Sequence, residues 1–366
     1  MGANKPEEKI RPAPMEGRGA YNRSSRVQAA GSSPAVPLIE KVAGQVSLPA
    51  DPETVVIADY GSSEGHNSLV PVRAAIDVLR DRIGRERPIS VVHTDLPGND
   101  FGALFQTLAS DPNSYLLGDP AVFPSAIGRS FYEQILPDSS VTLGWSSWAV
   151  QWLSRVPALI PDQVQVAYSR DAAARAVFSL RAAQDWQLFL RHRSAELRPG
   201  GRLVTLSMAV DDQGDFGYRA SVAAIYDSLT DLVEEGLVSA SEMHRMVIPT
   251  YGRTRADFLA PFAESGRFAG LSLEELEIFY GEDHIWDKFQ RDGDAAAFGM
   301  RWAAFSRASV GPTLAAALDN GVARAPEFIE RLGARMAARL AAAPEKTSIP
   351  LAKMVLVKDS PVPSER

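Results

Sequence analysis

The stretch Thr54-Val55-Val56-Ile57-Ala58-Asp59-Tyr60-Gly61-Ser62-Ser63-Glu64-Gly65-His66-Asn67 joins an apolar run to a turn that contains two glycines. The apolar run predicts a β-strand, and the amphipathic segment 68–83 after the turn predicts a helix. Gly61 and Gly65 let the backbone turn tightly and approach a ligand where a side chain would collide. This order of strand, turn and helix is typical of an α/β domain that binds a nucleotide-like ligand.

The turn also narrows the choice of ligand. It lacks the full Gly-x-Gly-x-x-Gly spacing that a dinucleotide favours, and no Lys-Ser/Thr pair follows it for a nucleoside triphosphate. Asp59, an acid at the end of the strand, suits a ligand with hydroxyl groups and positive charge. S-adenosylmethionine is such a ligand, because it carries a ribose, an ammonium and a sulfonium.

The length and composition of the chain exclude several classes of protein. The chain has 366 residues, of which 45% are hydrophobic, so it can bury one large core or a core with a sizeable insertion. Its net charge of −7 predicts no nucleic-acid partner and no anionic membrane surface. The absence of cysteine excludes disulfides, thiolate-bound metals and a thiol nucleophile, and is compatible with the cytoplasmic location that we expect. The sequence contains no apolar run of about 18 residues, so we expect no membrane span.

Further strands and helices follow along the chain. Residues 89–95 form a second predicted strand that ends in Asp95, which makes a strand-helix-strand unit of a parallel sheet. A helix that contains Trp148 and Trp152 is predicted to begin after a cap at Ser146 or Ser147. Other strands are expected at 115–118, 141–145, 202–208 and 353–358, and helices largely within 101–108, 172–197, 221–246, 254–265 and 298–343.

Five segments, taken in order, resemble the SABATH family of S-adenosylmethionine-dependent carboxyl methyltransferases. They are Ala58-Asp59-Tyr60-Gly61 with Gly65-His66-Asn67, Asp95-Leu96-Pro97-Gly98-Asn99-Asp100-Phe101, Ser130-Phe131-Tyr132, Ser146-Ser147-Trp148 with Trp152-Leu153-Ser154, and Pro199-Gly200-Gly201-Arg202. A weaker sixth is Ile248-Pro249-Thr250-Tyr251. The Asp95–Phe101 run is much more specific than the glycine turn.

The resemblance implies a fold and a division of the chain. The fold is a class I methyltransferase α/β fold, Rossmann-like, with a seven-stranded, mostly parallel sheet and an α-helical cap. We expect a flexible N-terminus at 1–14, a cofactor domain at 15–210 whose segment 15–50 gates the substrate, a mainly helical cap at 211–345, and a closing strand and tail at 346–366. The implied cofactor is S-adenosylmethionine, with S-adenosylhomocysteine as its product, and the implied assembly is a homodimer.

The resemblance also assigns residues. Those implied to contact the cofactor are Tyr21, Asp59, Gly61, Asn67, Asp95, Leu96, Ser130, Phe131 and Ser147. Gln28 and Trp152 match the pair that hydrogen-bonds the substrate carboxylate, and Trp148, Gln151 and Tyr251 match positions that line the acceptor pocket. Because Gln151 is polar, it suggests an acceptor with a second polar or carboxyl group.

No metal is predicted. Some members of the family have a magnesium site that involves an asparagine, and Tyr168 stands at that position here. The five histidines show no metal-binding spacing.

Methyl transfer to a carboxylate requires little from side chains. The acid is already ionised at pH 7, so no general base is needed, and in-line alignment of oxygen, carbon and sulfur drives the displacement. Neutral donors such as Gln28 and Trp152 orient the oxygen and leave it nucleophilic. The predicted product is the methyl ester of a small, aromatic acid, which could be a dicarboxylic acid.

Four alternatives stay open from the sequence. Trp145, Trp148 and Trp152 could form one helical face packed in the core. The enzyme could methylate a nitrogen or a phenolic oxygen, which would need a base near the acceptor. It could instead be a nicotinamide-dependent oxidoreductase, or a cofactor-binding scaffold without activity.

Overall fold

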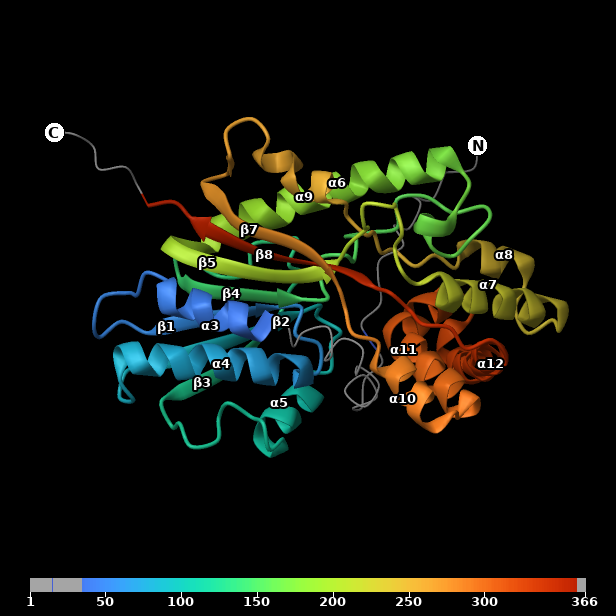
Figure 1. The fold of residues 1–366 in the computed structure, drawn as a ribbon, viewed down its shortest axis with the longest axis horizontal. Coiled ribbons are helices and arrows are strands. Elements are labelled where there is room, and N and C mark those ends of the chain that lie inside the picture. Colours follow the sequence, from blue (N-terminus) through green and yellow to red (C-terminus); the bar gives the residue numbers. More distant parts are fainter. Residues whose placement is uncertain (1–14, 16–34, 361–366) are drawn as a thin grey trace, which may run out of the picture.

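A central eight-stranded sheet organises the computed structural model, which describes residue 15 and residues 35–360 (Figure 1). Along the sheet the strands follow the order β3-β2-β1-β4-β5-β8-β7-β6. The first five are parallel to one another, whereas β8, β7 and β6 are antiparallel to their neighbours. The strands are β1 (Val55–Tyr60), β2 (Ile89–Asp95), β3 (Val122–Gly128), β4 (Val141–Ser147), β5 (Leu197–Met208), β6 (Arg267–Phe268), β7 (Leu271–Tyr280) and β8 (Pro350–Lys358).

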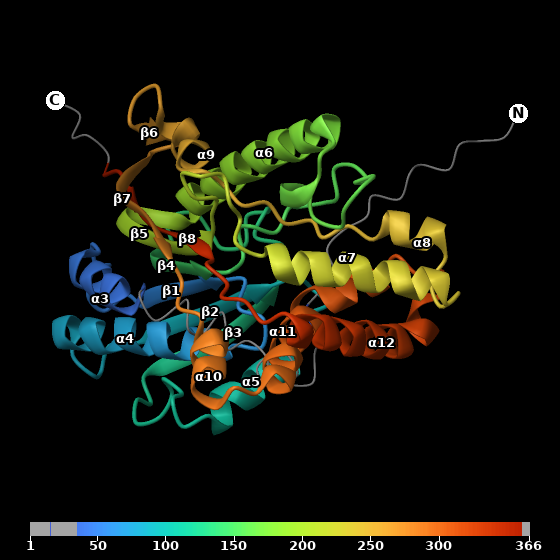
Figure 2. The same ribbon diagram turned by 45° about the vertical axis from the view of Figure 1, so that its right-hand side comes forward.

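Helices cover both faces of this sheet. In Figures 1 and 2, α3 and α4 lie along one face and α6 lies along the other. The helices are α3 (Val36–Gln45), α4 (His66–Ile83), α5 (Phe101–Ser110), α6 (Ala172–Glu196), α7 (Arg219–Glu234), α8 (Ala240–Arg245), α9 (Arg255–Leu259), α10 (His284–Asp292), α11 (Ala295–Ala315) and α12 (Gly321–Ala342). The predicted α/β class is confirmed.

The period-two alternation of strand side chains divides the core between the two faces. In β1, Ile57 packs in the cluster that includes α3 and α4, and the next residue, Ala58, packs in the cluster that includes Trp186 and Phe189 of α6. Both residues are fully buried. A strand that is buried on both faces has apolar residues at successive positions. The apolar run at residues 54–58 predicted β1 for this reason.

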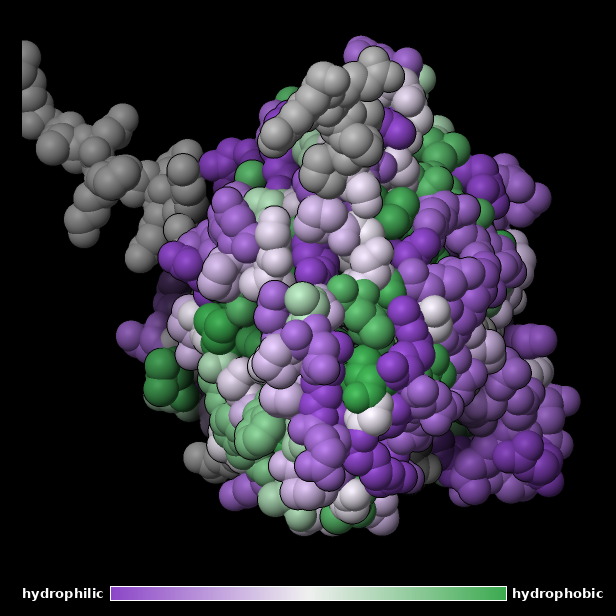
Figure 3. All heavy atoms as spheres, turned by 90° about the vertical axis from the view of Figure 1, so that its left-hand side faces the viewer, coloured by the Kyte–Doolittle hydropathy of each residue, from purple (hydrophilic) through white to green (hydrophobic). Residues whose placement is uncertain are grey.

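The cap helices α7, α8, α10, α11 and α12 stand beyond one end of the sheet (Figures 1 and 2). This is the end at which the parallel strands finish, because β5 runs through Met208 into the loop that leads to α7. The opposite end of the molecule shows mainly hydrophilic side chains interspersed with hydrophobic ones (Figure 3). The cap and the carboxyl edge of the sheet therefore enclose the space in which a ligand of this fold class binds.

The third strand lies later than predicted. Residues 115–118 form a turn, and β3 occupies Val122–Gly128 instead. This strand is at the edge of the sheet, so it tolerates Pro124 and exposes Phe123. Because β3 is partly exposed, its residues do not form an apolar run, and the hydrophobic pattern of the sequence did not predict the strand.

The sheet has one strand more than the seven predicted. The additional strand, β6, pairs over two residues with the start of β7, and the connecting residues Ala269 and Gly270 both have positive φ. This two-residue connection is a tight hairpin turn.

The predicted cap boundary of 211–345 is wrong for residues 267–280. These residues form β6 and β7, which belong to the sheet. The bulge between Leu273 and Glu275 breaks the alternation of β7, which removes the period-two pattern from its sequence. We propose that the cap consists of α7, α8 and α10 to α12.

The predicted helix after β4 is also wrong. The strand continues to Ser147, and residues 148–152 form an irregular segment in which Trp148 has φ of 55°. A positive φ is uncommon for a bulky residue, and it rules out the alternative in which the three tryptophans form one helical face. Trp145 is buried in the core on β4, whereas Trp148 and Trp152 line a pocket.

Within the described residues, every helix is too short or too polar to span a bilayer.

Candidate active site

Acidic and polar side chains meet where the parallel strands end. Asp59 is the fifth of the six residues of β1, Asp95 closes β2 and Ser147 closes β4. Since β1 lies between β2 and β4, the sheet brings these three residues together although 88 positions separate the first from the last (147 − 59). The sequence-predicted cofactor residues on β1, β2 and β4 thus share one edge.

Gly61 forms the floor of the turn after β1. Its φ is +89°, and a Cβ added there would lie 2.4 Å from the Cβ of Ala149 and 3.8 Å from Cε1 of Phe131. The turn therefore lies against the segment after β4 and against the Phe131 ring. The neighbouring hydroxyls of Ser62 and Ser63 are buried and have no hydrogen-bond partner within the described residues. A backbone cradle with spare polar groups fits the methionine part of the cofactor.

Gly61→Ala should lower the free energy of unfolding by about 2–4 kcal/mol, because it adds a collision to the cost of a positive φ. Urea unfolding measures the change. Gly236→Ala is the matched control, since Gly236 has φ of +75° but no heavy atom within 4 Å of an added Cβ. Equal losses in the two variants would show that the contact with Ala149 relaxes without cost.

Asp95 is held by the backbone of two turns. Its Oδ2 accepts the N–H of Ser63 at 2.7 Å, and its Oδ1 accepts the N–H of Leu96 at 2.7 Å. Burial raises the pKa of Asp95 to about 6; the two N–H donors act in the opposite direction, and the nearby Asp59 adds to the rise. A carboxylate that is fixed in place and has lone pairs to spare suits the two hydroxyls of a ribose.

The raised pKa of Asp95 predicts how cofactor affinity depends on pH. The ionised carboxylate accepts both ribose hydroxyls better than the neutral acid, so affinity should rise as pH rises through about 6 and then level off. Between pH 5 and pH 7 we expect about a tenfold gain for S-adenosylhomocysteine. Calorimetric titration measures it, and Asp95→Asn should flatten the profile. A profile that stays steep in this variant would assign the titration to another group.

The raised pKa of Asp95 also predicts the direction in which the stability of the folded protein changes with pH. Because the unfolded Asp95 ionises at lower pH than the folded one, the contribution of Asp95 to the stability of the ligand-free protein falls as pH rises from about 4 to about 6.

Asp59 belongs to a buried chain of hydrogen bonds. Its Oδ2 lies 2.8 Å from Nδ1 of His93, and Nε2 of His93 lies 2.7 Å from the hydroxyl of Tyr115. Burial raises the pKa of Tyr115, so its hydroxyl stays protonated, and Nε2 of His93 accepts this hydroxyl in the tautomer that carries its proton on Nδ1. The Nδ1–H of His93 then donates to Asp59, which fixes the carboxylate in one orientation. The sequence showed only that His93 lacks a metal-binding spacing, and it gave no sign of the link to Asp59.

A buried ion pair anchors the segment that carries Ser130 and Phe131. The guanidinium of Arg193, on α6, donates to the backbone oxygens of Phe131 at 2.7 Å and of Glu133 at 2.9 Å. It also pairs with Glu196, whose Oε2 accepts the Tyr60 hydroxyl at 2.6 Å. Arg193 and Glu196 are fully buried. This network connects the turn at Phe131 to the end of β1. The sequence did not reveal it, because Arg193 and Glu196 have the common i, i+3 spacing of a charge pair on a helix.

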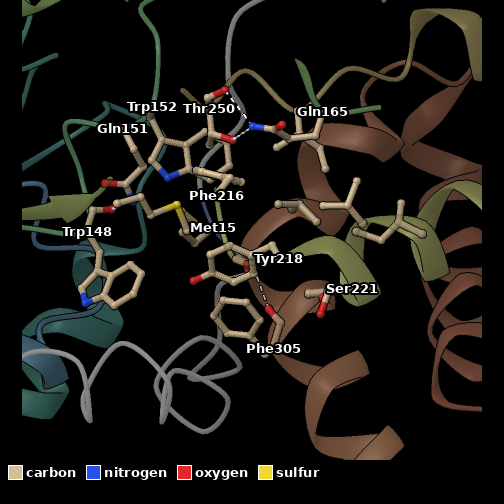
Figure 4. A pocket seen from close by; sticks show the side chains of 17 residues that line it. Met15, Trp148, Gln151, Trp152, Gln165, Phe216, Tyr218, Ser221, Thr250 and Phe305 are labelled. Atoms are coloured by element: carbon tan, nitrogen blue, oxygen red, sulfur yellow. Dashed lines mark hydrogen bonds between the residues drawn. The ribbon is translucent and has the colours of Figure 1, made fainter. Parts of the chain in front are cut away.

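A pocket of about 610 Å³, measured with its opening, lies between the carboxyl ends of β4 and β5 and helices α7 and α11 (Figure 4). Aromatic and aliphatic side chains predominate in its lining, with a few neutral polar groups. The lining comprises Met15, Trp148, Gln151, Trp152, Gln165, Met208, Phe216, Tyr218, Ser221, Val222, Ile225, Ile248, Thr250, Phe305, Ser306, Ser309 and Val310. Among these described residues there is no acidic, basic or histidine side chain.

Trp152 presents a hydrogen-bond donor to this pocket. Its indole nitrogen faces the space between the lining side chains and has no partner among the described residues (Figure 4). Its backbone is fixed on both sides, because its oxygen accepts the Tyr132 hydroxyl at 2.5 Å and its N–H donates to Ala149 at 2.9 Å. Arg253, which is buried, donates to the oxygen of Val150 at 2.6 Å and so braces the same segment.

Gln151 lines the pocket and also supports the strained residue beside it. Its Nε2 donates to the backbone oxygen of Trp148 at 2.5 Å, and its Oε1 accepts the Ser207 hydroxyl at 3.2 Å. Trp148 donates its backbone N–H to Leu206 at 2.9 Å. Gln151 thus has only part of its hydrogen-bonding capacity available to an acceptor.

Tyr251 does not lie in the pocket. Its ring packs in the separate cluster around Leu153 and Val247, and the preceding residue, Thr250, lines the pocket instead. Neighbouring residues of an extended segment point to opposite sides, so a shift of one position exchanges them. The other predicted positions Asn67, Leu96, Ser130 and Phe131 are partly exposed near the carboxyl edge, whereas Tyr21 and Gln28 lie outside the described residues.

Several lining residues went unpredicted because they come from the cap. Phe216, Tyr218, Ser221 and Phe305 carry no local motif, and Tyr218 stacks on Phe305 with ring centroids 6.2 Å apart. Only the packing of α7 against α11 brings them to the site.

Tyr168, which stands where some family members have the asparagine of a magnesium site, accepts the backbone N–H of Tyr218 with its hydroxyl at 2.8 Å. In the part of the chain that the structure describes, no group of three or more His, Cys, Asp or Glu residues is arranged to hold a metal.

Comparison with known proteins decides the family. A family model described as SAM dependent carboxyl methyltransferase matches residues 9–358. The chain belongs to this family. The predicted SABATH family is thereby confirmed, and the predicted enzyme class and cofactor are those of the family.

Individual relatives are more distant. Methyltransferase FUS9 of Gibberella fujikuroi is 30% identical over 247 residues, which cover 67% of this chain and 65%, just under two thirds, of the relative. Salicylate carboxymethyltransferase of Clarkia breweri is 30% identical over 66% of this chain and 67% of its own. The solved structure of loganic acid methyltransferase with SAH covers 95% of this chain and 99% of its own with a TM-score of 0.77. At 18% identity, that likeness concerns the fold alone.

Proposed function

We propose that this carboxyl methyltransferase family member converts the carboxylate of a small, aromatic acid into its methyl ester. One observation carries the proposal: the unpaired indole N–H of Trp152 faces an apolar pocket whose described lining is entirely neutral. S-adenosylmethionine, when bound, supplies the methyl group. Asp59, Asp95, Asn67 and the Gly61 turn are the residues that would hold it at the edge of the sheet.

The chain's own contribution is orientation. Trp152 donates one hydrogen bond to a carboxylate oxygen, and Gln28, outside the described residues, is proposed as the second donor. Neutral donors hold the carboxylate without forming the tight ion pair that an arginine or lysine would make. Because the pocket is mostly apolar, the oxygen keeps little of its water shell and its single orientation can be enforced.

The lining disfavours a nitrogen or phenol acceptor. Such an acceptor must lose a proton, and a base within hydrogen-bond reach would serve that step. The described lining offers no carboxylate, histidine or lysine. A carboxylic acid, ionised at pH 7, needs none.

A labelled-cofactor assay tests the proposal. Benzoate, salicylate, benzene dicarboxylates, furan dicarboxylates and indole acids are supplied in turn, and the products are tested for saponification. We expect label in a base-labile methyl ester from at least one acid. Label found only in alkali-stable methylamines or aryl ethers would overturn the proposal in favour of the second acceptor class.

The relatives guide the choice of acids, since one is named for salicylate and others for benzoate and indole-3-acetate. A homodimer in the cytoplasm is the assembly and location we propose for this chain, and sedimentation of the purified protein tests the assembly.

A further inference from the structure

The pocket has two chemically different ends. Trp148 and Trp152 lie at one end, whereas Ser221 lies on the other side of Tyr218 and Phe305 (Figure 4). Ser221 is the third residue of α7, and Ser306, from α11, also lines the pocket. An acceptor whose carboxylate meets Trp152 would therefore direct its opposite end toward the Ser221 side.

The two serine hydroxyls are buried and available. Ser221 is 5% exposed and Ser306 is 4% exposed. Neither hydroxyl hydrogen-bonds to any group in the described part of the chain. By contrast Ser309, one turn further along α11, donates to the backbone oxygen of Phe305 at 2.7 Å. Buried hydroxyls without partners in an otherwise apolar region favour a ligand that supplies the missing hydrogen bonds.

The charge of the surroundings limits what this ligand group can be. No described lining residue is cationic, so a second carboxylate would be buried without a counter-ion. The N-cap residue Tyr218 and, from α7, Ser221, Val222 and Ile225 line the pocket, an i, i+3, i+4, i+7 spacing that places the side of the helix there. The positive end of the α7 dipole therefore does not point at the ligand, and it would not stabilise a buried carboxylate. An uncharged group is the better fit.

We propose that Ser221 and Ser306 form a specificity site for an uncharged hydrogen-bonding group, such as a hydroxyl or carbonyl, at the end of the acceptor acid remote from its carboxylate. The inference rests on the proposed function, because the carboxylate at Trp152 defines the orientation of the acid. Gln151 suggested an acceptor with a second polar or carboxyl group. The serine site favours a hydroxy or oxo acid over a dicarboxylic acid.

Two matched series of acids test the site. They are benzoates and cinnamates with methyl, hydroxymethyl or carboxylate at the 4-position, which provide two lengths. In the wild-type protein the hydroxymethyl acid should have the highest kcat/KM of the better-fitting series. Ser221→Ala and Ser306→Ala should each reduce the hydroxymethyl-to-methyl ratio by about 3- to 10-fold, and the double variant should bring it close to one.

Ser228→Ala provides the control. Ser228 lies two turns further along α7; it is fully buried and its hydroxyl has no hydrogen-bond partner among the described residues, but it does not line the pocket. The ratio should be unchanged in this variant. A wild-type preference for the methyl or the carboxylate acid, or a ratio that survives the double substitution, would overturn the inference.

A binding measurement separates this inference from the proposed function. Each acid is titrated calorimetrically into the protein saturated with S-adenosylhomocysteine. If the hydroxymethyl acid binds in a serine-dependent way but no acid of either series or of the earlier panel is ever esterified, the proposed function fails and the specificity site stands. If none of the six acids binds, the specificity site is overturned as well.

Discussion

Trp152→Phe should lower kcat by about 10²- to 10³-fold while the affinity for S-adenosylhomocysteine changes less than threefold. The substitution keeps an aromatic ring in the pocket and removes the donor that we assign to the carboxylate. Loss of a donor that fixes the reacting oxygen affects the step at which alignment matters most. Steady-state kinetics with the best acid, together with calorimetric titration of the cofactor product, measure the two quantities.

Trp145→Phe is the control for losing a tryptophan. The indole nitrogen of Trp145 is buried in the core on β4 and has no hydrogen-bond partner in the described part of the chain, so its replacement removes no hydrogen bond seen there. We expect kcat within about twofold of wild type and a modest loss of stability from the smaller ring. Equal kinetic damage in both variants would mean that Trp152 acts through packing and not as a donor.

Asp95→Asn should weaken S-adenosylhomocysteine binding by about 10²- to 10³-fold, the largest effect on affinity that we expect from one substitution. An amide offers one acceptor oxygen where the carboxylate offers two, and hydrogen bonds to a charged acceptor contribute about 1.5–3 kcal/mol each. The amide also presents an NH₂ group to the N–H of Ser63 or Leu96, which now donate to the carboxylate. Calorimetric titration at pH 7.5 measures the loss.

Asp100→Asn is the matched control for Asp95. Asp100 caps α5 by accepting the N–H of Ala103 at 2.9 Å, and asparagine caps helices equally well. Cofactor affinity should stay within about threefold. If instead Asp95→Asn and Trp152→Phe reduced cofactor affinity equally, the separation of cofactor and acceptor residues would be mistaken.

Local sequence was sufficient for the cofactor edge. Gly61, Asp59 and Asp95 lie at the ends of strands that are buried on both faces, and an apolar run followed by a glycine turn or an acid marks such an end. The parallel arrangement then follows from the strand-helix-strand order, since right-handed connections bring successive strand ends to one edge. These positions could be predicted because each depends on a few neighbouring residues.

Other elements lacked a local signal. Strand β3 is exposed at the sheet edge, and the bulge in β7 interrupts its alternation. The segment at Trp148 has the spacing of a helix, but hydrogen bonds to Leu206 and from Gln151 hold it in an irregular, strained path. In each case a partner distant in the sequence overrides the local preference.

The sequence by itself determined the sheet, the family and the edge at which the cofactor residues gather, because these are encoded in turns and buried strands. Tertiary structure alone decided the acceptor pocket: it placed Thr250 there in place of Tyr251, joined His93 to Asp59, set Ser221 opposite Trp152 and added Ser306 to the lining. The physical reason is that the cap helices acquire their positions by burying one another's apolar faces, and that packing has no short-range signature.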